Sequence, residues 1–453
     1  MKLSKHKLGE LIEVTRGASL SGQFYAEEGE LIRLTLGNFN MNGGGFKENT
    51  SKTDLYYTGT VKDEFILNKG DIITPLTEQS LGLLGTTARI PENGKYIQSQ
   101  DVALVKCKEG LLDPNFCYYL ISSSIVRQQL SAGAQQTKIR HTSPDKIKDC
   151  TVWVPEFEEQ KRIGRILTDI DEKITLNRQI NDNLEAMAKQ LYDYWFVQFD
   201  FPNEEGKPYK SSGGTMVYNE KLKREIPQGW HCYELNKWLE IKSGFAFKSE
   251  TYISKGKFKV VTIKNVQDHH LDTSSCDYVY EIPQGMKEWC SLSVNDRLIS
   301  LTGNCGRLCI VTENDLLLNQ RVGLLACNDE YIDYAYLLLS SEEYQTLSNN
   351  LAKGAAQANL SPVDLCKNIA VLPKLDVLEK FNRQIKPIVA SYIQNEIQIA
   401  ELTKQRDELL PLLMNGQATV NYHLSLHLSN TVLYTLHYLG TVQNHVVRVL
   451  KII

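Results

Sequence analysis

Two long stretches with a heptad pattern constrain the fold of this chain more than any other feature of its sequence. In the first, from about Glu156 to Phe199, alternating steps of four and three place mostly apolar residues on one seam: Ile163, Leu167, Ile170, Ile174, Asn177, Asn181, Leu184, Ala188, Leu191 and Trp195. In the second, from about Leu375 to Met414, the same steps recur 218 residues later: Phe381, Ile385, Ile388, Tyr392, Asn395, Ile399, Leu402, Arg406, Leu409 and Leu413. A 3.5-residue repeat over four heptads predicts a coiled-coil seam. We therefore expect two long helices that pair with each other; two amphipathic helices, each packing on its own domain, are the alternative.

One asparagine falls at the same place in each seam, at Asn177 and Asn395. A buried amide in a coiled coil lowers stability but disfavours every register that leaves it without a partner. We predict that these two asparagines fix the register of the helices.

The length and composition indicate a soluble protein with more than one core. The chain has 453 residues, 42% of them hydrophobic and 23% charged, and single cores stop growing well below this size. The net charge of −4 does not favour a nucleic-acid binder, although local basic clusters count for more than the sum. No run of 18 apolar residues and no secretory signal is present, so we expect a cytoplasmic protein without membrane contact. Ten cysteines without any C-x-x-C pair favour free thiols over a metal site.

A globular block of about 150 residues precedes each helix, and the two blocks share landmarks. The segment ending at Gly17 matches the one ending at Gly244, 227 residues on, and Asn38 matches Asn265 at the same offset. Short helices are expected at 115–122 and 333–340, each beginning with a polar capping candidate. The blocks are therefore predicted to be copies of one unit whose loops have diverged.

These patterns predict an α+β fold, with two pseudo-symmetric globular α/β-mixed domains separated by two long antiparallel coiled-coil helices. The expected segments are a first domain at 1–155, a helix at 156–200, a Gly/Pro-rich linker at 201–228, a second domain at 229–374, a helix at 375–416 and a tail at 417–453. Alternating apolar residues from Tyr422 suggest a strand or hairpin in the tail, whose role the sequence does not indicate. His423 and His427 would lie about 13 Å apart in a strand, too far to share a metal ion.

The sequence holds no catalytic constellation. It contains no G-x-S-x-G, H-E-x-x-H, P-loop or G-x-G-x-x-G motif. The segment that starts at Asp113, Asp-Pro-Asn-Phe, faintly resembles an amino-methyltransferase motif but is better explained as a helix cap. The G-x-x-G pairs at Gly82 and Gly303 are expected in turns rather than around a phosphate. We therefore predict a non-catalytic protein.

Two similar domains held by paired helices would present two different recognition surfaces at a set separation. Helices of about 40 residues span roughly 60 Å, and duplex DNA rises 3.4 Å per base pair. The outermost contacts would then be limited to roughly 17 base pairs, and a split DNA target with an unread spacer follows.

The order of these segments resembles a known family. The linker ending Lys223-Arg-Glu-Ile-Pro-Gln-Gly-Trp230 and the second helix ending Leu409-Leu-Pro-Leu-Leu-Met-Asn-Gly416, in this arrangement, resemble the specificity subunit of type I restriction-modification systems over residues 1 to about 420. The resemblance implies target-recognition domains that each read half of a double-stranded DNA site. It also implies docking of two methyltransferase subunits on the helices, with restriction subunits joining the complex. S-adenosylmethionine, ATP and Mg would belong to those partners, with no cofactor in this chain. A coiled-coil scaffold that presents two protein-binding modules without DNA contact is the alternative.

Candidate DNA-binding residues cluster in corresponding loops of the two blocks. Glycine would let the backbone approach phosphates, Arg and Lys would neutralise them, and Asn and Gln could bond adenine. The loop at 133–140 also resembles the loop that members of the family place at the DNA. The predicted residues are Thr15, Arg16, Gly17, Ser19, Asn38, Gln135, Gln136, Lys138 and Arg140 in the first block, and Lys242, Gly244, Lys248, Asn265, Gln357 and Asn359 in the second. Merely solvated loops are the alternative for each of them.

Overall fold

The computed structural model describes residues 2–40, 44–78, 82–132, 140–352, 358–422, 433–438 and 450–451, with side chains as far as residue 418. The chain divides into two compact units. Unit 1 comprises Met1–Lys173 with Leu402–Ile453, and unit 2 comprises Ile174–Glu401. Each unit contains one mixed α/β domain together with part of each long helix.

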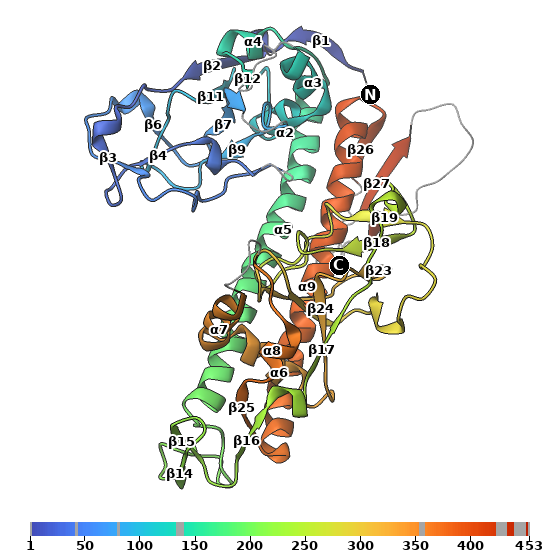
Figure 1. The fold of residues 1–453 in the computed structure, drawn as a ribbon. Helices are drawn as coiled ribbons and strands as arrows, with labels where there is room; N and C mark the ends of the chain where they lie inside the picture. Colours follow the sequence, from blue (N-terminus) through green and yellow to red (C-terminus); the bar gives the residue numbers. More distant parts are fainter. Residues whose placement is uncertain are drawn as a thin grey trace. The chain divides into compact units, whose positions relative to one another are not determined.

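The first domain lies in unit 1 and consists of short strands with small helices (Figure 1). Its strands are β1 (Ser4–Lys7), β2 (Ile12–Arg16), β3 (Tyr25–Ala26), β4 (Ile32–Arg33), β5 (Tyr56–Tyr57), β6 (Ile66–Leu67), β7 (Ile72–Pro75), β8 (Thr77–Glu78), β9 (Ala88–Arg89), β10 (Tyr96–Ile97), β11 (Val102–Cys107), β12 (Arg140–His141) and β13 (Thr151–Val154). Its helices are α1 (Leu8–Leu11), α2 (Pro114–Ser122), α3 (Ser124–Ala132) and α4 (Pro144–Lys148). The two larger sheets have the orders β2-β11-β7-β9 and β3-β5-β4-β10-β6. Leu34, Ile73 and Leu104 lie in the core between them.

The second domain lies in unit 2 and repeats this topology. Its strands are β16 (His231–Glu234), β17 (Glu240–Ser243), β18 (Phe258–Val261), β19 (Asp277–Val279), β20 (Ser291–Leu292), β21 (Arg297–Ser300), β22 (Leu308–Ile310), β23 (Leu316–Leu318), β24 (Val322–Ala326) and β25 (Ile369–Leu372), and its helices are α6 (Ile332–Ser340), α7 (Glu342–Ala352) and α8 (Pro362–Cys366). The sheet β17-β24-β21-β22 has the order of β2-β11-β7-β9. The parallel pair β18–β23 corresponds to β4–β10, and the antiparallel pair β16–β25 corresponds to β1–β13. The predicted duplication and the mixed fold class are confirmed.

The two long helices are α5 (Phe157–Tyr192) and α9 (Leu375–Met414) (Figure 1). In unit 2 they run antiparallel: Asn177 bonds Gln398 and Asn181 bonds Glu396, so positions on α9 rise as positions on α5 fall. Predicted seam residues are buried in both units, among them Ile163, Leu167, Ile174, Phe381, Ile385 and Leu413. The helices therefore pack through the predicted heptad face.

The first helix ends earlier than the sequence pattern predicted. After Tyr192 the chain makes a π-helical turn at Asp193–Val197, and Phe199 has a positive φ of 63°. A π turn places one extra residue in the turn. This allows both Trp195 and Phe196 to pack on Phe381, with ring centroids 5.6 and 4.8 Å away. At the C-terminal end of α5, packing of buried aromatic rings therefore accompanies a departure from regular α-helical geometry.

The two asparagines that were predicted to fix the register have different surroundings in the structure. Asn177 is half-buried and donates to Gln398, whereas Asn395 donates to Asn181 at 3.0 Å. Asn181 is 4% exposed and also donates to the carboxylate of Glu396 at 2.7 Å. Of the two predicted residues, only Asn395 belongs to the buried seam network, in which its partner is Asn181. Asn177 was favoured because it occupies the equivalent heptad position, but antiparallel helices bring non-equivalent positions together.

The short helices begin differently in the two domains. Asp113 caps α2 by accepting a hydrogen bond from the backbone N–H of Phe116, as the cap interpretation of this segment predicts. Asp333, expected to cap the corresponding helix, lies inside α6 instead. Its carboxylate accepts a hydrogen bond from the buried guanidinium of Arg297 at 2.6 Å. An ion pair to the core therefore replaces a cap in the second domain.

The segment 201–228, interpreted from its composition as a linker, is folded. It contains the hairpin β14 (Met216–Asn219) and β15 (Arg224–Pro227). Phe201 stacks on Tyr209 and on Trp230, with centroids 4.7 and 4.9 Å apart. The buried carboxylate of Asp200 accepts from both the N–H and the hydroxyl of Ser211. The connection between the first helix and the second domain is thus folded as part of unit 2.

The tail forms an antiparallel sheet of β26 (Ala418–Tyr422), β27 (Leu433–Tyr438) and β28 (Leu450–Lys451). His423, His427 and most of the alternating segment lie outside the described residues. Across the parts of the chain that the structure describes, none of the helices combines the length and apolar character needed to span a membrane.

Candidate nucleic-acid interface

One end of the sheet β2-β11-β7-β9 gathers the predicted loops of the first domain. Arg16 at the end of β2 pairs with Ala103 on β11, which pairs with Thr74 on β7. Immediately beyond β7, Glu78 on β8 pairs with Arg140 on β12. The turn after β2 and Arg140, at the end of the 133–140 loop, therefore follow from the same end of the sheet β2-β11-β7-β9, with Arg140 on the small sheet β8-β12 that continues from β7.

The second domain has the same arrangement. Ser243 at the end of β17 pairs with Gly323 on β24, which pairs with Ile299 on β21. Beyond β21, Thr302 forms a bridge with Asn359. The predicted residues on either side of Ser243 and at the end of the second loop thus lie at the equivalent edge.

The two predicted glycines have a structural role within the chain. A Cβ on Gly17 would lie 2.2 Å from the carbonyl oxygen of Gln98, and one on Gly244 would lie 2.3 Å from that of Leu318. The next residue in each turn donates its N–H to the same carbonyl. Only glycine permits so close a backbone approach. Their conservation of position between the domains is explained by packing against a neighbouring strand, whether or not phosphate binds nearby.

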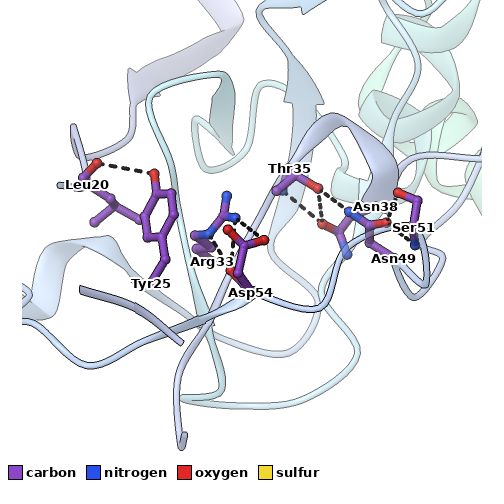
Figure 2. A network of polar contacts seen from close by, with 8 residues as sticks. All are labelled: Leu20, Tyr25, Arg33, Thr35, Asn38, Asn49, Ser51 and Asp54. Carbon is purple, nitrogen blue, oxygen red and sulfur yellow. Dashed lines mark hydrogen bonds and ion pairs between the residues drawn. The ribbon is translucent and has the colours of Figure 1, made fainter. Parts of the chain in front are cut away.

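Asn38 and Asn265 are occupied inside their own domains. The Asn38 side-chain oxygen accepts from the N–H and hydroxyl of Thr35 (Figure 2). The Asn38 amide donates to the carbonyl of Lys47. Asn265 makes the same bonds to Thr262 and donates to a carbonyl in its own loop. Both residues are buried, at 2% and 1% exposure. Because both side-chain amides already bond groups inside their own domains, neither residue is part of the proposed interface.

The remaining described candidates differ in how exposed their side chains are and in the contacts that they make. Lys242 is half-buried over the ring of Trp289 at 5.3 Å, and the half-buried Arg140 lies 3.7 Å from the buried carboxylate of Glu78. The fully exposed candidates are Thr15, Arg16, Ser19, Lys248 and Asn359. Gln135, Gln136, Lys138 and Gln357 lie outside the described residues. The exposed residues and the two half-buried cations are the part of the prediction that can meet a ligand without unfolding.

The structure also aligns a turn that sequence comparison of the blocks missed. The backbone N–H of Leu76 donates to the carbonyl of Asp101, and that of Leu301 donates to the carbonyl of Arg321. Leu76 and Leu301 each follow the corresponding strands β7 and β21, so Asp101 and Arg321 are equivalent positions. The same edge of the sheet therefore carries a carboxylate in one domain and a guanidinium in the other.

Beside this pair, both domains place an exposed glutamine, Gln100 and Gln320. Their offset of 220 lies between the 227 and 218 of the other landmarks, and this regularity could have revealed them. Arg321 is exposed, whereas the Asp101 carboxylate accepts from the hydroxyl of Thr77. Glutamine can bond adenine bidentately and arginine suits guanine or phosphate. This edge thus combines one shared and one differing group that suit base recognition.

The metal-ligating side chains and the thiols of the described residues do not form a metal site. The searched residues contain no group of three His, Cys, Asp or Glu side chains placed to hold a metal ion. All ten cysteines fall in the described ranges and are free thiols. Burial raises the pKa of Cys150 to about 11 and that of Cys276 to about 12, which keeps both thiols protonated and poorly nucleophilic at neutral pH.

The chain therefore consists of a duplicated α/β domain and two paired long helices, and each copy of the domain has exposed residues in equivalent turns. This arrangement is typical of a recognition protein with two similar binding domains. Comparison with known proteins identifies the family: the sequence profile described as the type I restriction modification DNA specificity domain matches residues 2–186 and 227–406. The chain belongs to this family.

Characterised relatives and a solved structure agree with this assignment. The MjaIX specificity subunit of Methanocaldococcus jannaschii is 27% identical over 325 residues, covering 69% of this chain and 71% of that protein. The HindI specificity subunit of Haemophilus influenzae is 22% identical over 389 residues, covering 72% and 84%. The crystal structure of the type I restriction-modification S subunit from M. genitalium has the same fold, with a TM-score of 0.56 at 17% identity over 91% of this chain and 96% of that one.

Proposed function

We propose that this chain is the specificity subunit of a type I restriction-modification complex, in which each domain reads one half of a split target in double-stranded DNA. The main observation behind this proposal is that the two domains present equivalent turns that carry different exposed side chains. A common framework holds Gln100 and Gln320 in equivalent turns, while Asp101 and Arg321 differ beside them. Two copies of one scaffold with different exposed groups suit two different half-sites.

Phosphate contacts would come from cations around each edge. Arg16 is exposed in the first domain, and Lys248 and Arg321 are exposed in the second. Such contacts fix the orientation of the protein on the duplex but carry little sequence information. The overall negative charge of the chain is compatible with this role because methyltransferase partners can supply further positive surface.

The helices would serve as a docking surface for two methyltransferase subunits, with restriction subunits joining the complex. An apolar stripe on α5, formed by Leu176, Ile180 and Met187, supports this part of the proposal. These side chains are 54%, 38% and 52% exposed, and their spacing of four and seven residues puts them on one face beside the seam. Exposed apolar stripes of this kind mark protein contacts.

In the proposed complex, the partner subunits catalyse the reactions and this chain catalyses none. S-adenosylmethionine would bind to the methyltransferase subunits, and ATP and Mg to the restriction subunits. Purified chain incubated alone with labelled S-adenosylmethionine and DNA should transfer no methyl group. Methyl transfer without partners would contradict the proposal.

The decisive experiment determines the modified sequence with and without the Arg321→Ala substitution. Methylation sequencing of cells that carry the complex should yield a motif in two parts separated by unread bases. Arg321→Ala should relax one base in one half only, with discrimination reduced by about 1–3 kcal/mol. Lys221→Ala, an exposed cation in the hairpin of unit 2, is the control and should leave both halves unchanged. An unbroken motif, or equal change in both halves, would refute the assignment.

Docking can be tested separately. Leu176→Glu with Met187→Glu should prevent assembly with methyltransferase subunits, as measured by mass photometry. Arg178→Glu adds negative charge on a different face of the same helix and should still assemble. If the complex assembled normally but bound its target no better than a random duplex, the scaffold interpretation would be favoured instead.

A further inference from the structure

Unit 2 contains a cavity of about 610 Å³ where α5 and α9 meet α6 and α7. Its size falls within the range of about 300–1,000 Å³ that is common for small-ligand sites. Leu184, Ala188 and Tyr192 contribute from α5, and Val389 and Tyr392 contribute from α9. Recognition of DNA, as proposed above, gives this cavity no role.

The internal repeat shows what occupies the equivalent place in unit 1. An offset of 218 relates α5 to α9, as in Ile163 and Phe381, and it also relates α2 to α6. By this offset, three lining residues correspond to residues of unit 1: Ala188 to Arg406, Val389 to Asp171 and Leu337 to Tyr119.

Those three residues form a closed polar network in unit 1. Arg406 Nη1 lies 3.0 Å from a carboxylate oxygen of Asp171, and the hydroxyl of Tyr119 donates to the other oxygen at 2.6 Å. The Arg406 side chain is only 11% exposed. A cation with an apolar stem therefore fills this place in unit 1, whereas unit 2 substitutes alanine, valine and leucine, which leave the space open and its wall apolar.

Acidic side chains outnumber cationic side chains in the lining of the cavity in unit 2. Its lining includes two fixed cations, Lys189 and Arg224, and six carboxylates, from Asp182, Glu185, Asp193, Asp333, Glu342 and Glu343. Asp333 is paired with Arg297, but Glu185 makes no ion pair within the described residues. Desolvation, with Asp182 and Glu396 nearby, raises the pKa of Glu185 to about 7, while His270 and a hydrogen bond with Tyr392 act in the opposite direction. A neighbouring cation would relieve this cost.

Glu185 is well placed to meet a ligand that also contacts the apolar wall. It lies three residues before Ala188 on α5, so the two side chains share a helix face. Tyr192, one turn further along the helix, adds an aromatic surface on which a guanidinium can stack.

We propose that this cavity binds a cation on an apolar stem, of the alkylguanidinium kind, with its charged end at Glu185 and its stem against Ala188, Leu337 and Val389. The bound group occupies the place that Arg406 occupies in unit 1. It comes either from a small amphiphilic guanidine or from an arginine side chain of a partner polypeptide, since the recognising chemistry is the same.

The test is isothermal titration of the full chain with n-butylguanidinium, with n-butylurea as the uncharged control of the same shape. We expect the guanidinium to bind at least about tenfold more tightly than the urea, because only the cation can pair with Glu185. Affinity should fall as pH drops below about 7, where Glu185 becomes protonated. N-acetyl-arginine amide distinguishes the sources: tighter binding of the amide than of n-butylguanidinium indicates an arginine side chain, and weaker binding indicates a small guanidine.

Substitutions make the assignment specific to this cavity. Glu185→Gln should weaken n-butylguanidinium binding at least about tenfold, whereas Glu220→Gln, at an exposed carboxylate outside the cavity, should not change it. Ala188→Arg should abolish binding by filling the site, and Ala188→Arg with Val389→Asp provides the pair found in unit 1 should the single variant misfold. Equal binding by wild type and Glu185→Gln, or no binding of any guanidinium, would overturn the proposal.

Discussion

Replacing Asn181 by leucine tests which polar residue fixes the register of the long helices. The substitution removes a hydrogen bond to the Glu396 carboxylate at 2.7 Å and one from Asn395 at 3.0 Å. A bond to a charged group is worth about 1.5–3 kcal/mol and a neutral one about 1 kcal/mol. Burying leucine returns about 1.5–3 kcal/mol at best. Because Glu396 stays buried with one partner fewer, we expect a net loss of about 1–2 kcal/mol.

Asn177→Leu is the matched comparison. Asn177 bonds Gln398 at 3.2 Å in an exposed setting, so its replacement should change stability by no more than about 0.5 kcal/mol. The assay is urea unfolding of each full-length variant, followed by far-ultraviolet circular dichroism. Asn181→Leu, Asn395→Leu and the double variant complete a cycle, and we expect a coupling of about 0.5–3 kcal/mol between the two sites. A larger loss for Asn177→Leu than for Asn181→Leu, or additive effects in the cycle, would refute the reasoning.

Three further predictions concern unit 2. Asp333→Leu should cost about 3–5 kcal/mol in urea unfolding because Arg297, 1% exposed, loses its carboxylate, and adding Arg297→Met should restore most of that loss. Gly244→Ala should lower the melting temperature measured by calorimetry, whereas Gly22→Ala, whose added Cβ would meet nothing closer than 3.9 Å, should not. The folded chain binds more protons than the unfolded chain between the ordinary pKa of Glu185, 4.5, and its raised value of about 7, so stability should fall across that interval as pH rises. Glu185→Gln should flatten this dependence by on the order of 1–2 kcal/mol, after allowance for partial exposure, and an unchanged pH profile would contradict the cause given for the shift.

Features set by periodicity were predictable from the sequence. The heptad spacing placed Ile163 and Phe381 on a buried seam, and constant offsets matched Gly17 with Gly244. A repeat along the chain imposes the same backbone bonds in each copy, so these inferences needed no knowledge of distant contacts.

Features set by individual side-chain bonds were not predictable. Asn38 has the composition of a base-reading residue, yet its amide serves Thr35 and Lys47. Asp333 has the position of a cap, yet Arg297 recruits it to the core. In both cases a side chain's function depends on a bond that spacing alone does not reveal. The equivalence of Asp101 and Arg321 was established by backbone pairing, although the 220-residue offset of the adjacent glutamines also indicates it.

The first and last strands of each domain are neighbours, since β1 pairs with β13 and β16 pairs with β25 along four residues each. The two ends of each domain therefore meet in one antiparallel strand pair, and the interior of the domain lies between them along the chain. An insertion, a deletion or a wholesale exchange of that interior by recombination leaves the junction unaltered. Under the proposed function, exchanging the interior of one domain would alter the reading of one half of the target and leave the long helices unchanged.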